Sequence, residues 1–124
     1  MVVGGYTATG STASVEVVDL SGHNKICKPV ADYPYPIEGH AMATINGQPI
    51  VCGGQKGGSI TNECYRYDGN DNQWKPFPSM KTKRSWHQSL QLGRNQFMMA
   101  GGQCTNLNGL MLGCVIIKLD FPQL

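Results

Sequence analysis

The sequence predicts an all-β fold made of repeated, four-stranded antiparallel units. Two observations lead to this prediction. A pair of glycines follows a short apolar run three times, at 4–5, 53–54 and 101–102. A segment that ends in aspartate follows each pair: SVEVVD (14–19), ECYRYD (63–68) and VIIKLD (115–120). No long stretch shows the apolar spacing of an amphipathic helix, so strands are the expected elements throughout.

The first two strands of each unit flank the glycine pair. The runs before the glycines are MVV (1–3), PIVC (49–52) and FMMA (97–100). Apolar runs of this length that end in glycine are typical of strands. In the following segment, Cys64 and Arg66 alternate with Tyr65 and Tyr67, which is the two-residue period of a strand. A polar or glycine-rich loop is expected to connect the two strands.

Two further strands complete the unit. The turns GNDN (69–72) and SGHN (21–24) consist of residues that favour turns, and the matched strands QWKPFP (73–78) and ICKPVA (26–31) follow them. The fourth strand is WHQSLQL (86–92) or GHAMATI (39–45), which places His40 and His87 at equivalent positions. A period of about 48 residues with four antiparallel strands is typical of a β-propeller blade.

The repeated glycines call for a structural explanation. Glycine inside a strand is unfavourable because of its backbone entropy and its missing side chain. A pair that recurs in each unit therefore predicts a close approach, in which a neighbouring strand or a flat ring lies on the bare backbone. Trp74 and Tyr67 are candidates to supply that ring.

The pattern resembles the kelch repeat, in which a glycine pair is followed by Tyr-Asp, then Trp, then a loop with Met and Arg. The second copy has the whole set: Gly53, Gly54, Tyr67, Asp68, Trp74, Met80 and Arg84. The first copy keeps Gly4 and Gly5, and the third keeps Gly101 and Gly102. The resemblance implies an incomplete kelch-type β-propeller, with these glycines and Tyr67, Asp68 and Trp74 as its structural signature.

The expected division of the 124 residues is one partial propeller, 1–124. Blade 1 is partial (1–36), blade 2 is complete (37–80) and blade 3 is partial (81–124). Propellers usually close with at least four blades. We therefore expect the chain to be part of a longer protein, with self-assembly of copies to close the ring as the alternative.

One face of the propeller is the predicted binding surface. The loops after the glycine pairs and the loops that link the blades should share this face, and in kelch-like proteins it commonly captures a peptide. Exposed tyrosine and arginine beside polar loops suit protein binding. The predicted partner-binding residues are Arg84 first, then Lys83, Ser85, Gln55, Lys56, Tyr33, Tyr35, Gln103 and Asn106.

The predicted function is therefore a protein–protein interaction module that binds a partner protein or peptide, and not an enzyme. A substrate receptor in a ubiquitin-ligase adaptor is one context that the resemblance implies. The alternative is part of a propeller enzyme, galactose-oxidase-like or sugar-processing. The residues predict no cofactor and no metal site, because the cysteines match no zinc spacing.

Charge and hydropathy exclude other partner classes. The net charge is +2, from 10 basic and 8 acidic residues, which is too low to predict a nucleic-acid partner. The basic cluster of Lys81, Lys83 and Arg84 is expected to be a solvated loop. No apolar run has the length of a membrane span, so no membrane partner is predicted.

The five cysteines allow two interpretations. Cys52 and Cys64 align with apolar residues of the other copies, which favours buried free thiols in a cytoplasmic protein. The alternative is an extracellular protein with hairpin disulfides, because Cys52–Cys64 and Cys104–Cys114 each flank one hairpin loop.

Overall fold

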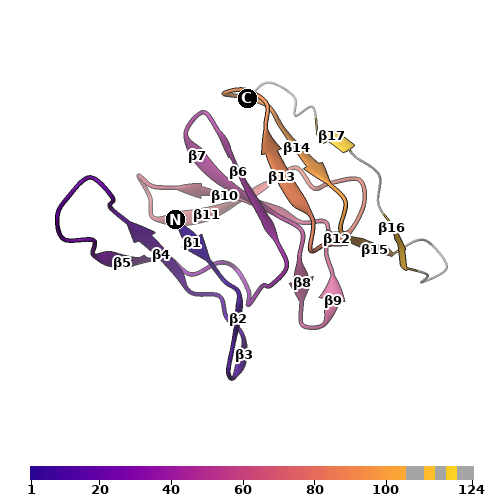
Figure 1. Ribbon diagram of the computed structural model, residues 1–124, viewed down its shortest axis with the longest axis horizontal. Coiled ribbons are helices and arrows are strands. Elements are labelled where there is room, and N and C mark those ends of the chain that lie inside the picture. Colours follow the sequence, from indigo (N-terminus) through magenta and orange to yellow (C-terminus); the bar gives the residue numbers. More distant parts are fainter. Residues whose placement is uncertain (106–110, 114–116, 120–124) are drawn as a thin grey trace.

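The computed structural model describes residues 1–105, 111–113 and 117–119, and every regular element within them is a β-strand. Four antiparallel sheets have three or four strands, and the three that contain the main strands lie side by side in chain order (Figure 1). The described part contains no helix long and apolar enough to cross a membrane. The all-β, antiparallel prediction is confirmed.

The middle sheet has the four strands predicted for a complete unit. They are β6 (Ala41–Ile45), β7 (Gln48–Cys52), β10 (Cys64–Asp68) and β11 (Gln73–Phe77), in the spatial order β11-β10-β7-β6. Asn46 and Gly47 connect β6 to β7 with φ of 50° and 77°. Two successive positive φ angles make the tight turn whose twist matches the hairpin strands.

The flanking sheets each have three strands in the described part. The first contains β1 (Val2–Val3), β4 (Val15–Val18) and β5 (Cys27–Val30), in the order β1-β4-β5. The third contains β13 (Gln88–Gln91), β14 (Phe97–Ala100) and β17 (Ile117–Leu119), in the order β13-β14-β17. Each predicted strand is present: β14 matches its segment, β7 begins one residue earlier, and the others are one to three residues shorter than the segments that predicted them.

Short ribbons occupy several segments that the sequence predicted as loops. They are β2 (Tyr6–Thr7) with β3 (Gly10–Ser11), β8 (Gln55–Lys56) with β9 (Ser59–Ile60), and β12 (Arg84–Ser85) with β15 (Gln103–Thr105) and β16 (Met111–Gly113). The β8–β9 ribbon forms because Gly57 and Gly58, with φ of 57° and 83°, reverse the chain in two residues. The loop prediction was incomplete at these places.

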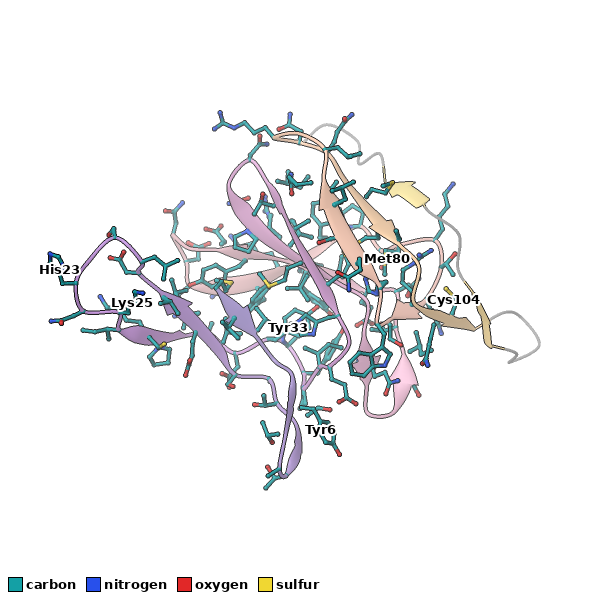
Figure 2. All side chains as sticks on the ribbon, viewed as in Figure 1. Tyr6, His23, Lys25, Tyr33, Met80 and Cys104 are labelled. Carbon is teal, nitrogen blue, oxygen red and sulfur yellow. A yellow bond between two sulfur atoms is a disulfide. The ribbon has the colours of Figure 1, made fainter. Side chains whose placement is uncertain are left out.

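Two hydrophobic clusters hold the sheets together. The first lies between the first and middle sheets and contains Val3, Val15, Tyr33, Ile37 and Val51. The second lies between the middle and third sheets and includes Ile50, Phe77, Met80, Phe97 and Met99. Figure 2 shows Tyr33 and Met80 in the interior, whereas Tyr6 and His23 lie on projecting loops. Adjacent sheets thus bury their faces against each other, as repeat architectures require.

The Tyr-Asp and Trp side chains of the middle unit are held by packing and hydrogen bonds. Tyr67 packs on Trp74 with ring centroids 5.3 Å apart. The Trp74 indole nitrogen donates to the carbonyl of Ala31, which is 3.0 Å away and directly follows β5 of the first sheet. Asp68 accepts from the Asn70 amide at 3.0 Å and orders the β10–β11 turn. These contacts fix the three side chains in the middle unit, and the assignment of Tyr67, Asp68 and Trp74 as the structural signature of the repeat stays a prediction.

The repeat extends to individual backbone hydrogen bonds. The Gly5 amide donates to the Ile37 carbonyl at 2.8 Å, and the Gly54 amide donates to the Arg84 carbonyl at the same distance. The Ile37 amide in turn donates to Thr12 at 3.1 Å, and the Arg84 amide to Thr61 at 3.2 Å. Ile37 and Arg84 therefore occupy the same structural position in successive linking segments, although one is apolar and the other is charged.

Each glycine pair contains a close approach, as predicted: a Cβ on Gly4, Gly53, Gly54 or Gly102 would clash, whereas Gly5 and Gly101 have no atom within 4 Å of that position. A Cβ on Gly53 would lie 2.5 Å from the Arg84 carbonyl oxygen and 2.7 Å from the ring of His87. A Cβ on Gly54 would lie 2.6 Å from the Glu38 carbonyl oxygen. The neighbours are therefore the linking segments and a histidine ring. The suggestion that Trp74 or Tyr67 covers these glycines was wrong. The two rings pack on each other, and Trp74 also contacts Tyr33 and bonds to Ala31 on the side of the first sheet.

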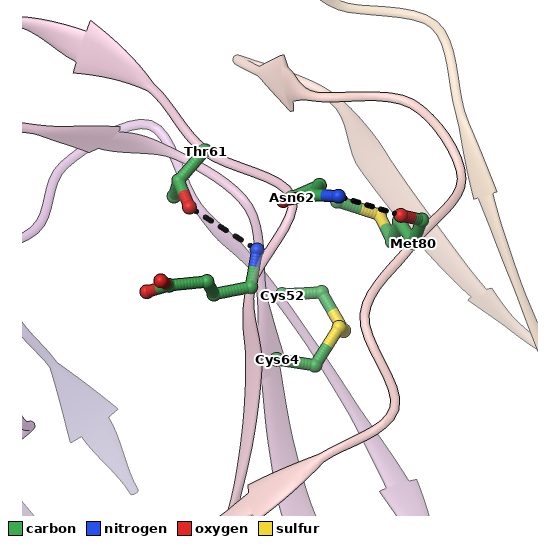
Figure 3. The surroundings of a disulfide bond; sticks show 6 residues. Cys52, Thr61, Asn62, Cys64 and Met80 are labelled. Atoms are coloured by element: carbon green, nitrogen blue, oxygen red, sulfur yellow. Dashed lines mark hydrogen bonds between the residues drawn. A yellow bond between two sulfur atoms is a disulfide. The ribbon is translucent and has the colours of Figure 1, made fainter.

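The preferred interpretation of Cys52 and Cys64 as free thiols is also wrong. They pair directly across β7 and β10 with Cα atoms 4.2 Å apart, and they form a disulfide (Figure 3). Such short separations are characteristic of pairs without mutual hydrogen bonds in antiparallel sheets. Cys104 is also disulfide-bonded, whereas Cys114, its predicted partner, lies outside the described residues. Cys27 is a free, exposed thiol.

Candidate binding face

One end of the sheets gathers most of the predicted binding loops. We call this surface the loop face and define it by the β8–β9 hairpin (55–60), the linking segments 31–40 and 78–87, and strand β15. The β2–β3 and β8–β9 hairpins project in the same direction at this end (Figure 1). The β6–β7 and β13–β14 turns lie at the opposite end (Figure 1).

Backbone hydrogen bonds fix the loops of this face to one another. Glu38 and Gln55 exchange two bonds, with the Gln55 amide 2.7 Å from the Glu38 carbonyl. On the other side of the hairpin, the Gly54 amide donates to the Arg84 carbonyl. Ser85 pairs with Gln103 in the β12–β15 ladder. The hairpin is therefore held between the two linking segments. Strand β15 pairs with the second of them, so the four segments form one hydrogen-bonded row.

The predicted binding residues divide by exposure. Lys56, Lys83 and Gln103 are exposed, and Gln55 and Tyr35 are half-buried. Arg84, Ser85 and Tyr33 are buried, with 1%, 0% and 2% of their surface exposed. Asn106 lies outside the described residues.

The expectation of an exposed Arg84 is therefore wrong. Its side chain points inward because β12 runs between Gly54 and strand β15, and the Nη1 atom donates to the Gly101 carbonyl at 3.2 Å. No ion pair joins Arg84 to another residue of the described part. Burial lowers the pKa of the guanidinium, because a low-dielectric environment disfavours the charged form.

Tyr35, Glu63 and Lys56 form a polar cluster on the loop face. The Tyr35 hydroxyl donates to Glu63 at 2.6 Å. The Lys56 ammonium lies 3.6 Å from the Glu63 carboxylate and 4.2 Å from the centre of the Tyr35 ring. Burial raises the pKa of Tyr35, and the bond to Glu63 adds to this effect. The cluster ties the first linking segment to the hairpin, and sequence analysis did not identify Glu63 as its third member.

Tyr33 belongs to the aromatic core beneath this cluster. Its ring makes edge contacts with Tyr35, Tyr65 and Trp74 at centroid distances of 5.3, 5.5 and 5.0 Å. Burial raises the pKa of its hydroxyl well above the ordinary value. Tyr33 therefore supports the linking segment from inside and does not reach the surface.

The two equivalent histidines lie under the glycine pairs. A Cβ on Gly54 would meet the His40 amide at 3.0 Å, and a Cβ on Gly102 would meet the His87 amide at 2.9 Å. Burial, followed by the charge of Arg84, lowers the pKa of His87 to about 4. Burial also lowers the pKa of His40. Both imidazoles are therefore neutral at physiological pH, and their equivalence confirms the alignment of the repeats.

Trp86 is an exposed aromatic residue of this face that sequence analysis placed in a strand. It lies in the second linking segment, outside β13, with φ of 56°. Its amide donates to the Gly39 carbonyl at 2.6 Å. The alignment that matches His40 with His87 also matches Gly39 with Trp86, so the sequence did contain a signal for this position.

Known proteins resemble this chain both in sequence motif and in fold. The kelch motif profile matches residues 37–81, which contain the whole of the four-stranded middle sheet. The chain contains a kelch motif. The solved structure of YjhT superimposes on the chain with a TM-score of 0.71 and 19% sequence identity. The alignment covers 85% of this chain and 31% of the YjhT chain. No curated protein matches the sequence.

The motif and the structural likeness bear on different claims. The YjhT likeness supports the fold alone, since its sequence identity is low. The chain spans about a third of the length of YjhT. Arg84 and Trp86 follow the matched kelch motif by a few residues, on the linking segment that leads to the next sheet. Kelch repeats commonly form propellers that bind other proteins, which agrees with the predicted class of partner.

Proposed function

We propose that the chain is a protein–protein interaction module that presents the loop face to a partner protein or peptide. The observation that supports this proposal most directly is the set of backbone hydrogen bonds that joins Glu38 to Gln55 and the adjacent Gly54 to Arg84. Such bonds hold loops in fixed positions, and binding surfaces are commonly built from loops on a rigid scaffold. That the chain has no enzymatic activity of its own is part of the proposal.

The exposed side chains of the face would make the contacts. Lys56, Lys83 and Gln103 are exposed, and each comes from a different segment of the row. The buried residues Tyr33 and Arg84 would act as supports that fix the backbone. This division assigns the binding residues by exposure, and it moves Arg84 from the contact surface to the scaffold.

A selection experiment with a matched control tests the proposal. Peptides that bind the chain are selected from a displayed random library, and their affinities are measured by calorimetry. The loop-face variant carries Lys56→Ala, Lys83→Ala and Gln103→Ala. The control variant carries Arg94→Ala, Asn95→Ala and Gln96→Ala, exposed residues of the turn at the opposite end.

The expected result is a loss of affinity of at least tenfold in the loop-face variant and an unchanged affinity in the control variant. Both variants should retain the thermal midpoint of the original chain, because all six side chains are exposed and an exposed ion pair such as Lys56–Glu63 contributes little to stability. Equal affinity of the two variants for every selected peptide would show that the binding surface lies elsewhere.

A more specific form of this proposal is that the chain captures substrates for a ubiquitin-ligase adaptor. Its support is limited to the kelch motif. In that case a partner captured by the loop face should be ubiquitinated in cells that express the full protein. If ubiquitination persists with the loop-face variant, the loop face is not the surface that captures the substrate.

A further inference from the structure

Trp86 has a backbone conformation that its side chain disfavours. Its φ of 56° is in the left-handed region, where bulky residues are rare. One repeat earlier the same position is Gly39, with φ of 62°. The fold therefore requires a left-handed residue at this point of each linking segment, and glycine meets that requirement without strain.

The neighbours of Trp86 maintain this conformation. Ser85 and His87 are buried on either side of it, with 0% and 3% of their surface exposed. The Trp86 amide is bonded to Gly39, and Ser85 pairs with Gln103 in β15. Strained residues that are held by the surrounding structure occur most often at functional sites. A strained and exposed tryptophan is therefore a candidate for direct contact with a ligand.

The indole lies partly on the bare backbone of Gly39. Its Cδ2 and Cε2 atoms would be 3.0 Å from a Cβ on Gly39, so a side chain there would push the ring away, and the φ of 62° also favours glycine. The side of the ring toward Gly39 is covered, yet 55% of the Trp86 surface remains exposed. An indole that is fixed on one side and open on the other offers a preformed aromatic surface.

An uncompensated carboxylate precedes the covered glycine. Glu38 is half-buried and forms no ion pair with another described residue. Lys56, which follows the Gln55 that pairs with Glu38, is instead held by Glu63 and Tyr35. Glu38 is adjacent in the chain to the glycine on which the indole lies, and a carboxylate at that position favours a cation, because the face of an indole also attracts positive charge.

We propose that Trp86 and Glu38 together bind a cationic side chain, arginine or lysine, of a partner peptide. This inference rests on the proposed function, because it assigns the contacts and the chemistry of one position on the loop face. The guanidinium or ammonium group lies over the open side of the Trp86 indole, and the Glu38 carboxylate pairs with it.

The two tryptophans of the chain make a direct test possible by NMR. The indole N–H of Trp74 is bonded to Ala31 within the aromatic core and serves as the internal reference. The indole N–H of Trp86 is assigned with Trp86→Phe. The probes are three capped tripeptides, Gly-Arg-Gly, Gly-Glu-Gly and Gly-Leu-Gly, titrated separately into the ¹⁵N-labelled chain. Only the arginine peptide is expected to move the Trp86 resonance, while the Trp74 resonance stays in place.

Two variants test the two contacts separately. Glu38→Gln keeps the size of the side chain and should weaken binding of the arginine peptide roughly fivefold. Trp86→Asn keeps a residue that tolerates the left-handed region and should abolish the shifts of the backbone amides around Gly39. Arg94→Gln is the control, because Arg94 is an exposed residue of the β13–β14 turn outside the loop face, and no loss of arginine binding is expected there.

Other outcomes would overturn the inference. A shift with the glutamate peptide would mean that the exposed Lys81 and Lys83 select an acidic partner. Equal shifts with the arginine and leucine peptides, or an unchanged affinity in Glu38→Gln, would mean that the carboxylate plays no part. No shift with any peptide would mean that the indole only covers Gly39. These titrations need no natural partner, so their failure is distinct from failure of the loop-face selection.

Discussion

A methyl group on Gly53 would lie 2.5 Å from the carbonyl oxygen of Arg84, closer than carbon and oxygen can approach without displacement. The same carbonyl accepts the amide of Gly54, so the linking segment lies against the glycine pair and is bonded to it. This contact fixes the second linking segment on the middle sheet. It also sets the position of the loop face relative to the strands.

Gly53→Ala is therefore expected to lower the free energy of unfolding by about 3 kcal/mol, through the clash and the unfavourable φ of 68°. Gly57→Ala is the matched control, because Gly57 has φ of 57° but no atom within 4 Å of its Cβ position. The control should lose only about 1 kcal/mol in urea unfolding. Equal losses would show that the close approach contributes nothing.

Replacement of Arg84 separates packing from charge. Arg84→Met keeps most of the volume and removes a buried charge that has no ion pair in the described part, so stability should be equal or about 1 kcal/mol higher. Arg84→Ala leaves a cavity and should cost about 2–4 kcal/mol. Thermal unfolding of the two variants gives the comparison. A methionine variant as unstable as the alanine variant would show that the guanidinium itself is required.

Acid should destabilise the fold through His87. Its pKa of about 4 in the folded protein lies below the ordinary value of 6.5, so the unfolded chain binds the proton more tightly. The resulting stability is complete above about pH 6.5 and is lost as the pH falls toward 4. We expect a loss of about 1–2 kcal/mol between pH 7 and pH 5.

Urea unfolding at both pH values measures this loss. His87→Gln should reduce the difference between the two pH values, whereas His23→Gln, on an exposed loop, should leave it unchanged. A pH dependence that is the same in His87→Gln and in the original chain would assign the effect to other groups.

The Cys52–Cys64 disulfide should contribute measurably to stability. It closes a loop with a sequence separation of 12, for which chain entropy predicts about 2–3 kcal/mol. Cys52→Ala combined with Cys64→Ala should lower the thermal midpoint, and a reductant should lower it in the original chain. An unchanged midpoint in the double variant would contradict the expectation.

Much of the architecture could be predicted because it depends on patterns that the sequence repeats. The glycine pairs, the segments that end in aspartate and the two histidines indicated the main strands and their order along the chain, whereas the pairing register was not predicted. The two-residue ribbons could not be predicted, because such short strands have no apolar alternation to reveal them. The β8–β9 hairpin, for example, follows from two positive φ angles at Gly57 and Gly58.

The candidate site was harder to predict because exposure is a property of the tertiary structure. A basic run such as that from Lys81 to Arg84 is usually solvated, and nothing local showed that Arg84 turns inward beside Gly54. The disulfide depended on direct pairing of Cys52 with Cys64, which the alignment allowed but did not require. Trp86 is the residue that sequence analysis should have identified, since it replaces a glycine in an otherwise consistent alignment of the two linking segments.

The equivalence of Ile37 and Arg84 also bears on how such a chain changes length during evolution. An in-frame loss of residues 38–84 would join Ile37 to Ser85, and the Ile37 carbonyl that accepts the Gly5 amide would still be supplied by the backbone. Recombination between neighbouring copies of the gene segment could therefore add or remove one whole repeat, and the backbone bond at the junction would be kept. Selection would then act on the side chains at each junction, which the shared backbone leaves free to differ.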